Sequence, residues 1–278
     1  MARRPRRVHT ANDEFQLTLA LLRNRRQRAR QGRFVVQGVR AINQALDHGW
    51  TVDALWYPAA QPLSRWATAT LERAPTATAV EAAPELIAEL SEKDEPAELL
   101  AVVRTLPDDL GRIPRRADAL VVAFDRPVSP GNVGSVIRSA DALGAQGMVV
   151  TGHAADVYDP QAVRASTGSL FALPVVREGS MDAVRAWLEA LRPDVPGLQV
   201  VGSSASAATA VADVDLARPT VLAIGNETRG LSQAWREACD ELVAIPMRGV
   251  ADSLNAAAAA AILLYEAARQ RTRAAAGA

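Results

Sequence analysis

The sequence predicts an α/β protein whose second half contains a parallel sheet. Short apolar segments of strand length alternate with segments of helical periodicity, an order typical of α/β folds. In the second half these apolar segments are continuous and rich in Val, Ile and Leu, as expected of strands buried on both faces of a parallel sheet. With 278 residues, 49% of them hydrophobic, the chain can bury one large core or two ordinary ones.

The first half divides into a basic arm, residues 1–32, and a small α/β unit, residues 33–106. Apolar segments predict the strands, and apolar residues at helical spacing predict the helices, the first of which ends at Gly49. The expected strands cover 32–38, 51–58 and 97–106, and the expected helices cover 39–49, 63–74 and 83–92. Residues 107–118 combine prolines, a glycine and mixed charges without periodicity, which indicates a linker.

The second unit, residues 119–278, carries the parallel sheet. Its expected strands cover 119–124, 147–152, 171–176, 198–204, 220–226 and 242–247. Its expected helices cover 133–143, 181–191, 231–238 and about 253–270. In the first helix, Val133, Val136, Ile137 and Ala140 recur at helical spacing and predict a face that packs on the sheet. The last helix contains six consecutive alanines, the residue with the highest helix propensity.

The net charge of zero hides an uneven distribution of charge. Ten arginines occur between Met1 and Arg33, against only Asp13 and Glu14. Such clustering is typical of a segment that binds a polyanion. A solvated, partly disordered tail has the same composition, so both interpretations stay open at this point.

Cysteine and histidine usage predicts no metal site. Cys239 is the only cysteine, and His9, His48 and His153 are scattered along the chain. The basic N-terminus lacks the apolar segment of a secretory signal. The longest apolar run, LNAAAAAAILLY, is too short to span a bilayer. These features predict a soluble, cytoplasmic protein.

Three glycine-containing turns follow strands of the second unit, where ligands bind in open parallel sheets. The first turn opens the helix in SPGNVGSVIRSADALGA. There Asn132 can cap the helix, Gly134 allows close approach, and Arg138 stands about one turn further on. An ion pair between Arg138 and Asp141 would explain the arginine but not the Asn-x-Gly spacing before it.

The second turn is VLAIGNETRGLS, in which Glu227 directly follows a buried strand. A carboxylate in that position needs hydrogen-bond partners, either backbone amides or a ligand. The third turn follows the strand that ends in Ile245-Pro246-Met247, and Ser253 is expected to cap the last helix.

The order and spacing of the three turns resemble a known family. N-x-G-x-x-x-R at 132–138, I-G-N-E-x-x-G-L at 224–231 and I-P-M-x-G-x-x-x-S-L-N at 245–255 resemble the motifs of SpoU-type (TrmH-like) RNA ribose 2′-O-methyltransferases of the SPOUT superfamily. The first unit resembles the small RNA-binding domain that often precedes the catalytic domain. The stretch 153–176 and the basic arm resemble rRNA methyltransferases that confer antibiotic resistance.

The resemblance implies a parallel sheet with a deep trefoil knot, a homodimer, and a bound methyl donor, S-adenosylmethionine. By motif matching, the donor contacts Gly202, Ser203, Gly225, Asn226, Ile245, Met247, Ser253 and Leu254. The resemblance also implies RNA as the substrate, rRNA rather than tRNA. The candidate RNA contacts in the arm are Arg23, Arg25, Arg26, Arg28 and Arg30.

The family's reaction methylates a ribose 2′-hydroxyl, which must lose its proton, so a base or a strong orienting group is needed. The residues carried over as catalytic are Asn132, Arg138, Glu227, Ser253 and Asn255. A guanidinium stays protonated in proteins, so Arg138 either clamps the adjacent phosphate or is deprotonated by a special environment. Ser253 either orients the reacting groups or only caps the helix.

Three alternatives remain at the level of sequence. A tRNA ribose methyltransferase shares the same motifs. A catalytically silent RNA-binding protein with this fold is disfavoured by the intact Arg138, Glu227 and Asn255. A dinucleotide-binding dehydrogenase is disfavoured because the first strand of the second unit is not followed by G-x-G-x-x-G.

Overall fold

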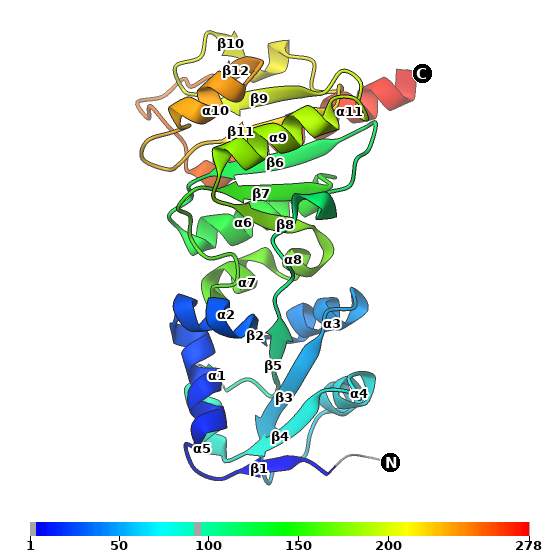
Figure 1. Ribbon diagram of the computed structural model, residues 1–278, viewed down its shortest axis with the longest axis vertical. Helices are drawn as coiled ribbons and strands as arrows, with labels where there is room; N and C mark the ends of the chain where they lie inside the picture. Colours follow the sequence, from blue (N-terminus) through cyan, green and yellow to red (C-terminus); the bar gives the residue numbers. More distant parts are fainter. Residues whose placement is uncertain (1–3, 92–95, 278) are drawn as a thin grey trace. The chain divides into compact units, whose positions relative to one another are not determined.

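A computed structural model describes residues 4–91 and 96–277, which form two compact units (Figure 1). The first unit comprises the residues up to Leu106 together with Asp156–Ala172. The second comprises Pro107–Ala155 and the residues from Leu173 onward. Residues 1–3 of the expected arm and the expected helix end at Glu92 lie outside the described residues.

The described residues of the first unit contain a five-stranded mixed sheet in the order β1-β4-β3-β5-β2. β5 runs antiparallel to both β2 and β3, whereas β4 runs parallel to β1 and β3. The strands are β1 (Arg6–Val8), β2 (Arg33–Gln37), β3 (Val52–Pro58), β4 (Thr78–Ala82) and β5 (Leu100–Arg104). The helices are α1 (Asp13–Arg23), α2 (Arg25–Gln31), α3 (Val39–Asp47), α4 (Arg65–Arg73), α5 (Pro84–Ser91), α7 (Pro160–Ser166) and α8 (Ser169–Ala172).

The basic arm is folded over its described part, which differs from the tail interpretation. The side chains of Asn12 and Asn24 accept hydrogen bonds from the first turns of α1 and α2 and so begin both helices. α1 buries Phe15, Leu19 and Leu22 in the core of the first unit. These apolar residues recur at i, i+4 and i+7, which is the spacing of one helix face.

Residues 156–172 contribute to the interior of the first unit. Tyr158 and Phe171 pack against Phe34 and Trp50, with ring centroids 4.6 to 6.5 Å apart. The indole nitrogen of Trp50 donates to the carbonyl of Phe171 at 3.0 Å. The sequence predicted a strand over 171–176, but α8 ends at Ala172 and β8 starts only at Val175.

Arg28 holds the same segment through a buried ion pair. Its side chain is 3% exposed and contacts Asp156 at 2.7 Å and Asp159 at 3.1 Å. It also donates to the carbonyls of Leu21 and Leu22. The prediction that Arg28 contacts RNA is therefore wrong, because its donors are already used inside the first unit.

The described residues of the second unit contain a seven-stranded, fully parallel sheet in the order β10-β12-β9-β11-β6-β7-β8. The strands are β6 (Leu120–Asp125), β7 (Gly147–Thr151), β8 (Val175–Glu178), β9 (Gln199–Ser203), β10 (Thr209–Ala210), β11 (Thr220–Ile224) and β12 (Glu241–Ala244). Its helices are α6 (Pro130–Ala142), α9 (Met181–Leu191), α10 (Gln233–Ala238) and α11 (Ala256–Gly277), and two short 3₁₀ turns are η1 (Leu110–Arg112) and η2 (Val211–Asp213). The parallel sheet predicted from the apolar runs is confirmed, while the two-residue β10 was not predicted.

Helices cover both faces of this sheet, which explains why β6, β7 and β11 are buried along their whole length (Figure 1). α9 and α10 pack on one face through Trp187, Leu188 and Trp235. α6 and α11 pack against each other on the opposite face. The trefoil knot implied by the family resemblance stays a prediction. Within the described part of the chain, no helix combines the length and apolarity needed to cross a membrane.

We predict that Arg28→Ala destabilises the protein by about 3–5 kcal/mol, because it leaves Asp156 buried without its counter-ion. Chemical denaturation monitored by tryptophan fluorescence measures this change. Arg6→Ala is the matched control, since Arg6 forms an exposed ion pair with Glu14, and such pairs contribute about 1 kcal/mol or less. Equal losses in the two variants would contradict the prediction.

Candidate active site

A cavity of about 330 Å³ lies beyond the carboxyl ends of β9, β11 and β12, beside the start of α11. Its walls come from residues 203–206, 224–228, 230, 236, 243, 245, 247, 252–254, 256 and 259. Ile224, Val243 and Ile245 contribute apolar surface, while serine, threonine and backbone groups contribute polar atoms. A concave site that combines apolar surface with polar groups suits a small organic ligand that has both kinds of surface.

The loop that follows β11 closes back tightly on its own start. Asn226 and Gly230 exchange backbone hydrogen bonds of 3.0 and 2.9 Å. A Cβ at Gly225 would lie 2.3 Å from the carbonyl carbon of Gly230, so only glycine fits there. This close approach explains the Gly225 that the second motif contains.

Glu227, Asn132 and Asn255 form a chain of side-chain hydrogen bonds. The amide nitrogen of Asn132 donates to Glu227 at 2.9 Å, and the amide nitrogen of Asn255 donates to the Asn132 oxygen at 3.2 Å. Glu227 also accepts from the backbone amides of Val128 and Ser129, at 3.1 and 3.4 Å. Three residues predicted to be catalytic are therefore brought into contact from three distant parts of the sequence.

These contacts keep Glu227 ionised. Partial burial on its own raises the pKa of the carboxyl, but the hydrogen bonds from Asn132 and from backbone amides outweigh it and lower the pKa below its ordinary value. At neutral pH the carboxylate is therefore a hydrogen-bond acceptor that orients the Asn132 amide, and it carries no proton to donate.

Asn255, rather than Ser253, caps the last helix. The Asn255 side-chain oxygen accepts from the backbone amides of Ala257 and Ala258 at 2.9 and 3.3 Å, and α11 begins at Ala256. The expected cap at Ser253 is wrong: its hydroxyl lies 3.4 Å from the Asp252 carboxylate, and the residue lines the cavity. Because its oxygen is committed to the cap, Asn255 presents its amide nitrogen to Asn132.

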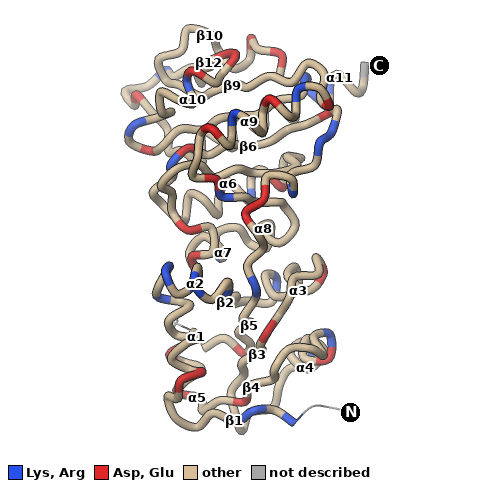
Figure 2. Tube along the Cα trace, in the orientation of Figure 1, with Lys and Arg blue, Asp and Glu red and all other residues tan. Residues whose placement is uncertain are grey.

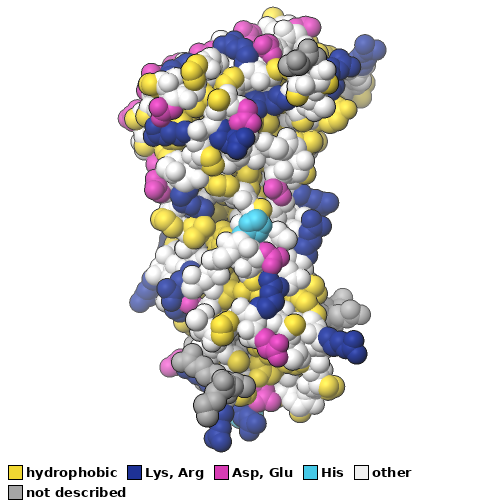
Figure 3. Space-filling model, turned by 90° about the vertical axis from the view of Figure 1, so that its right-hand side faces the viewer, with side chains coloured by type: hydrophobic (Ala, Val, Ile, Leu, Met, Phe, Trp, Pro, Cys, Tyr) yellow, Lys and Arg dark blue, Asp and Glu magenta, His cyan; other side chains and the backbone are white. Residues whose placement is uncertain are grey.

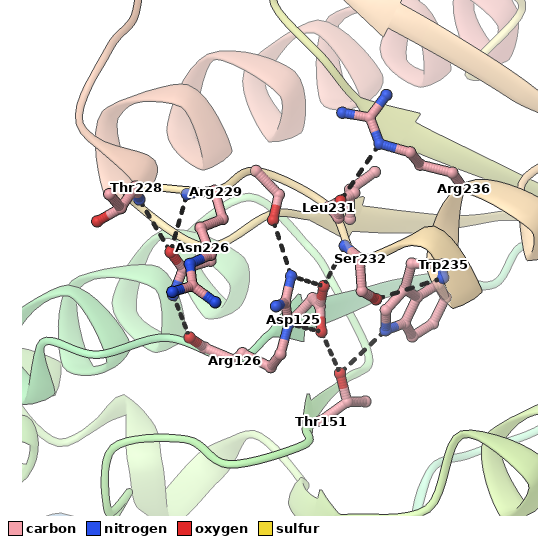
Figure 4. Close-up of polar contacts among 11 residues, drawn as sticks. Asp125, Arg126, Thr151, Asn226, Thr228, Arg229, Leu231, Ser232, Trp235 and Arg236 are labelled. Carbon is pink, nitrogen blue, oxygen red and sulfur yellow. Dashed lines mark hydrogen bonds and ion pairs between the residues drawn. The ribbon is translucent and has the colours of Figure 1, made fainter.

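A second network, which sequence reasoning missed, surrounds the buried Asp125 at the end of β6 (Figure 4). Asp125 accepts from the Ser232 amide at 2.7 Å and from the Arg126 guanidinium at 3.0 Å. The Thr151 hydroxyl donates to Asp125 at 3.4 Å and accepts from the Trp235 indole nitrogen at 2.9 Å. The available signal was an acidic residue at the end of an apolar strand, the same signal that singled out Glu227.

Most residues predicted to bind the methyl donor line the cavity. These are Ser203, Gly225, Asn226, Ile245, Met247, Ser253 and Leu254. Gly202 does not line it. A Cβ at Gly202 would lie within 2.6 to 2.8 Å of Cys239, Leu231 and Leu242, so this glycine serves the packing of β9. The same burial raises the pKa of the Cys239 thiol to about 12.

Arg138 lies apart from the cavity of its own chain. It is exposed, and it is not among the residues that line the cavity. On α6 it follows Asn132 by six residues, which puts it about 9 Å further along the axis and about 120° around the helix. The structure therefore does not bring Arg138 together with the other four predicted catalytic residues within one chain.

The other arginines predicted to contact RNA lie on α1 and α2 (Figure 2). Arg25, Arg26 and Arg30 are exposed, and Arg23 lies 4.0 Å from Glu89. On the face visible in Figure 3, Lys and Arg side chains are scattered among Asp and Glu side chains. Among the residues that the structure describes, no group of three or more His, Cys, Asp or Glu side chains could hold a metal ion.

Comparisons with known proteins match both units of the chain. The model of the SpoU rRNA Methylase family matches residues 119–265, and the model of the SpoU L30e-like domain matches residues 12–101. A 23S rRNA (uridine(2479)-2′-O)-methyltransferase from Streptomyces viridochromogenes is 54% identical over 267 residues, covering 96% of this chain and 93% of that protein. An uncharacterized tRNA/rRNA methyltransferase from Mycolicibacterium gilvum (strain PYR-GCK) is 39% identical over 168 residues, covering 59% of this chain and 52% of that protein.

Solved structures match along nearly the whole chain. The SpoU methyltransferase AviRb from Streptomyces viridochromogenes, in complex with the cofactor AdoMet, is 54% identical with a TM-score of 0.89, covering 94% of this chain and 98% of that one. An AdoMet-bound rRNA methyltransferase from Sinorhizobium meliloti is 31% identical with a TM-score of 0.84, covering 95% and 97%.

We predict that Asn132→Ala raises the pKa of Glu227, because the substitution removes a hydrogen bond to the charged form. A ¹³C NMR titration of glutamate carboxyls measures the shift. In the wild type the lowered pKa of Glu227 stabilises the folded state at pH values above the pKa of glutamate in the unfolded chain, about 4.3. This stabilisation is lost as the pH falls through the pKa of Glu227 in the folded state. The variant should lose part of that pH dependence. Asn12→Ala, which removes a helix cap in the first unit, should leave Glu227 unchanged; an unchanged pKa in Asn132→Ala would refute the hydrogen bond.

Proposed function

This chain belongs to the SpoU rRNA methylase family, and we propose that it transfers a methyl group from S-adenosylmethionine to the 2′-hydroxyl of a uridine ribose in 23S rRNA. The observation that carries the proposal is the cavity between the loops that follow β9, β11 and β12, together with the hydrogen-bonded chain of Glu227, Asn132 and Asn255 at its edge. The relative whose name states this reaction shares 54% identity over 96% of this chain.

The residues of the cavity fit the proposed methyl donor. Gly225 lets the loop close tightly on itself, because a Cβ there would lie 2.3 Å from the carbonyl carbon of Gly230, and this closure keeps the backbone of the loop in place along the cavity wall. Ile224, Ile245 and Leu254 offer apolar surface for an adenine ring, and exposed serines offer hydroxyls for its polar groups. When bound, S-adenosylmethionine would supply a methyl group to the 2′-oxygen and leave as S-adenosylhomocysteine, while the hydroxyl proton would pass to water.

The chain's own residues orient the acceptor. The ionised Glu227 accepts a hydrogen bond from the side-chain nitrogen of Asn132 and so fixes its orientation. The side-chain oxygen of Asn132 in turn accepts a hydrogen bond from the side-chain nitrogen of Asn255. This fixed row of amides is suited to holding a ribose hydroxyl in one orientation. Arg138 contributes a forked cation that matches the phosphate next to the reacting ribose.

We propose that Arg138 acts on the cavity of a second copy in a homodimer. Arg138 is exposed and lies away from its own cavity. Ile262 and Tyr265 form an exposed apolar stripe on α11, the helix that packs against α6. In a twofold dimer the same patch of both subunits forms the interface. The stripe on α11 of one copy would then pack against the same stripe of the second copy and be buried.

Arg138→Ala is predicted to abolish methylation while leaving donor binding intact. Incubation with labelled S-adenosylmethionine and separate 23S rRNA and tRNA pools, followed by mapping of the modified nucleotide, tests the substrate and the residue together. Label in tRNA alone would replace the rRNA proposal with the tRNA alternative.

Mixing Arg138→Ala with the cavity-blocking variant Ala259→Phe should restore about a quarter of wild-type activity if the site is shared across a twofold dimer. No recovery would contradict the shared site.

The exposed arginines of α2 are proposed to contact RNA phosphates. Arg26→Ala with Arg30→Ala is predicted to reduce the salt dependence of RNA binding by roughly 0.7–0.9 in slope for each lost contact. Filter binding at several salt concentrations measures the slope. Arg185→Ala, which removes an arginine paired with Glu237 in the second unit, is the control. An unchanged slope in the double variant would mean that these arginines only face solvent.

We further propose that the modification protects ribosomes from an antibiotic that binds the large subunit, and that the chain works in the cytoplasm, where its substrate lies. The resemblance of residues 153–176 and of the basic arm to resistance methyltransferases supports this. A strain that produces the wild type should tolerate such an antibiotic better than one that produces Arg138→Ala. Equal inhibitory concentrations would remove the resistance role and leave the methylation proposal standing.

A further inference from the structure

Arg126 makes contacts on several sides although it does not line the cavity (Figure 4). Its carbonyl oxygen accepts from the Asn226 side-chain nitrogen at 2.6 Å. Its guanidinium donates to both oxygens of Asp125 at 3.0 Å and to the carbonyl of Gly230 at 3.2 Å. Its own backbone amide donates to the carbonyl of Thr151 at 3.0 Å.

Arg126 adopts a left-handed backbone conformation, with φ of 52°. This conformation is uncommon for residues that carry a Cβ, and glycine adopts it without cost. An arginine at such a position implies that its side chain compensates for the strain. The two carboxylate contacts and the contact with Gly230 provide that compensation.

The fold also leaves space for this side chain. A Cβ at Gly152 would lie 2.7 Å from the Cγ of Arg126. Gly152 follows β7, the strand next to β6, so two neighbouring strand ends are shaped around one arginine.

The two residues that Arg126 holds are the two ends of the cavity loop. Asn226 opens the loop and Gly230 closes it, and both line the cavity. The Asn226 side-chain oxygen accepts from the backbone amides of Thr228 and Arg229, at 2.9 and 3.1 Å. Glu227 lies between these ends and faces Asn132.

We propose that Arg126 is a positioning residue that sets the shape of the loop 226–230, and thereby both the methyl-donor cavity and the direction of Glu227. It acts by clamping the ends of the loop to the end of β6, so that the donor side and the acceptor side of the site keep a fixed geometry. This role rests on the proposed function for its effect on methylation, but the clamp itself is independent of the reaction.

Arg126→Gly tests the guanidinium alone, because glycine accepts the left-handed backbone and keeps the carbonyl that Asn226 contacts. We expect the pKa of Glu227 to rise, the dissociation constant for S-adenosylmethionine to increase about ten-fold, and the single-turnover rate at saturating donor and RNA to fall. Arg126→Lys keeps the charge but loses the fork, so it should give intermediate values of all three quantities.

Arg115→Gly is the matched control. Arg115 lies in the same unit and also contacts an aspartate and a carbonyl, those of Asp194 and Ala190, but it touches no part of the cavity loop. The control should leave the pKa of Glu227 and donor binding unchanged. If Arg126→Gly fails to fold, Arg126→Lys carries the same three readouts.

Two results would overturn the proposal. One is an unchanged Glu227 pKa together with unchanged donor affinity in the folded Arg126 variants, and the other is an equal effect of Arg115→Gly. The NMR titration needs neither donor nor RNA. A wild type that binds donor but methylates no RNA would therefore refute the proposed function while the Glu227 pKa still decides the role of Arg126.

Discussion

Hydrogen bonds between the carboxyl end of β6 with the loop after it and the residues after β11 hold the candidate site together. Two carboxylates accept most of these hydrogen bonds. Asp125 accepts one from the backbone amide of Ser232, and Glu227 accepts one each from the backbone amides of Val128 and Ser129. A buried or half-buried carboxylate without hydrogen-bond partners is costly, so each of these two acids restricts where the segment opposite it can lie. The cavity and the row of amides beside it take their shape from this constraint.

Local sequence predicted which residues of the site need partners, but not what the partners are. The position of Glu227 after an apolar strand indicated a carboxylate that requires donors, and the structure supplies one from Asn132, 95 residues earlier. No periodicity carries that information, because pairing over such a distance is fixed by the order of strands in the sheet. The sequence predicted Ser253 as the N-cap of α11, whereas Asn255 caps it in the structure. Serine and asparagine both cap helices well, and only the tertiary contact of Asn255 with Asn132 distinguishes the two positions.

The predicted strands of both units matched the structure well where apolar runs were long, and less well where the chain is basic or short of apolar residues. The composition of the arm concealed its helices, because its nine arginines outnumber the four apolar residues of α1 that lie in the core, Phe15, Leu19, Leu21 and Leu22. Composition also cannot separate Arg28, which is buried, from Arg26 and Arg30, which are exposed. Only the location of Asp156 makes that distinction, and it lies 128 residues away.

The return of residues 156–172 into the first unit affects how the chain can fold as it is made. Phe34 and Trp50 cannot complete their aromatic cluster until Tyr158 and Phe171 have been translated and have left the ribosomal exit tunnel. Domains usually fold in the order of synthesis, but here the N-terminal unit must wait for a late segment while β6 and β7 are already available to pair. During this interval apolar surface near the N-terminus of the nascent chain stays uncovered. A ribosome-associated chaperone is most useful at this stage.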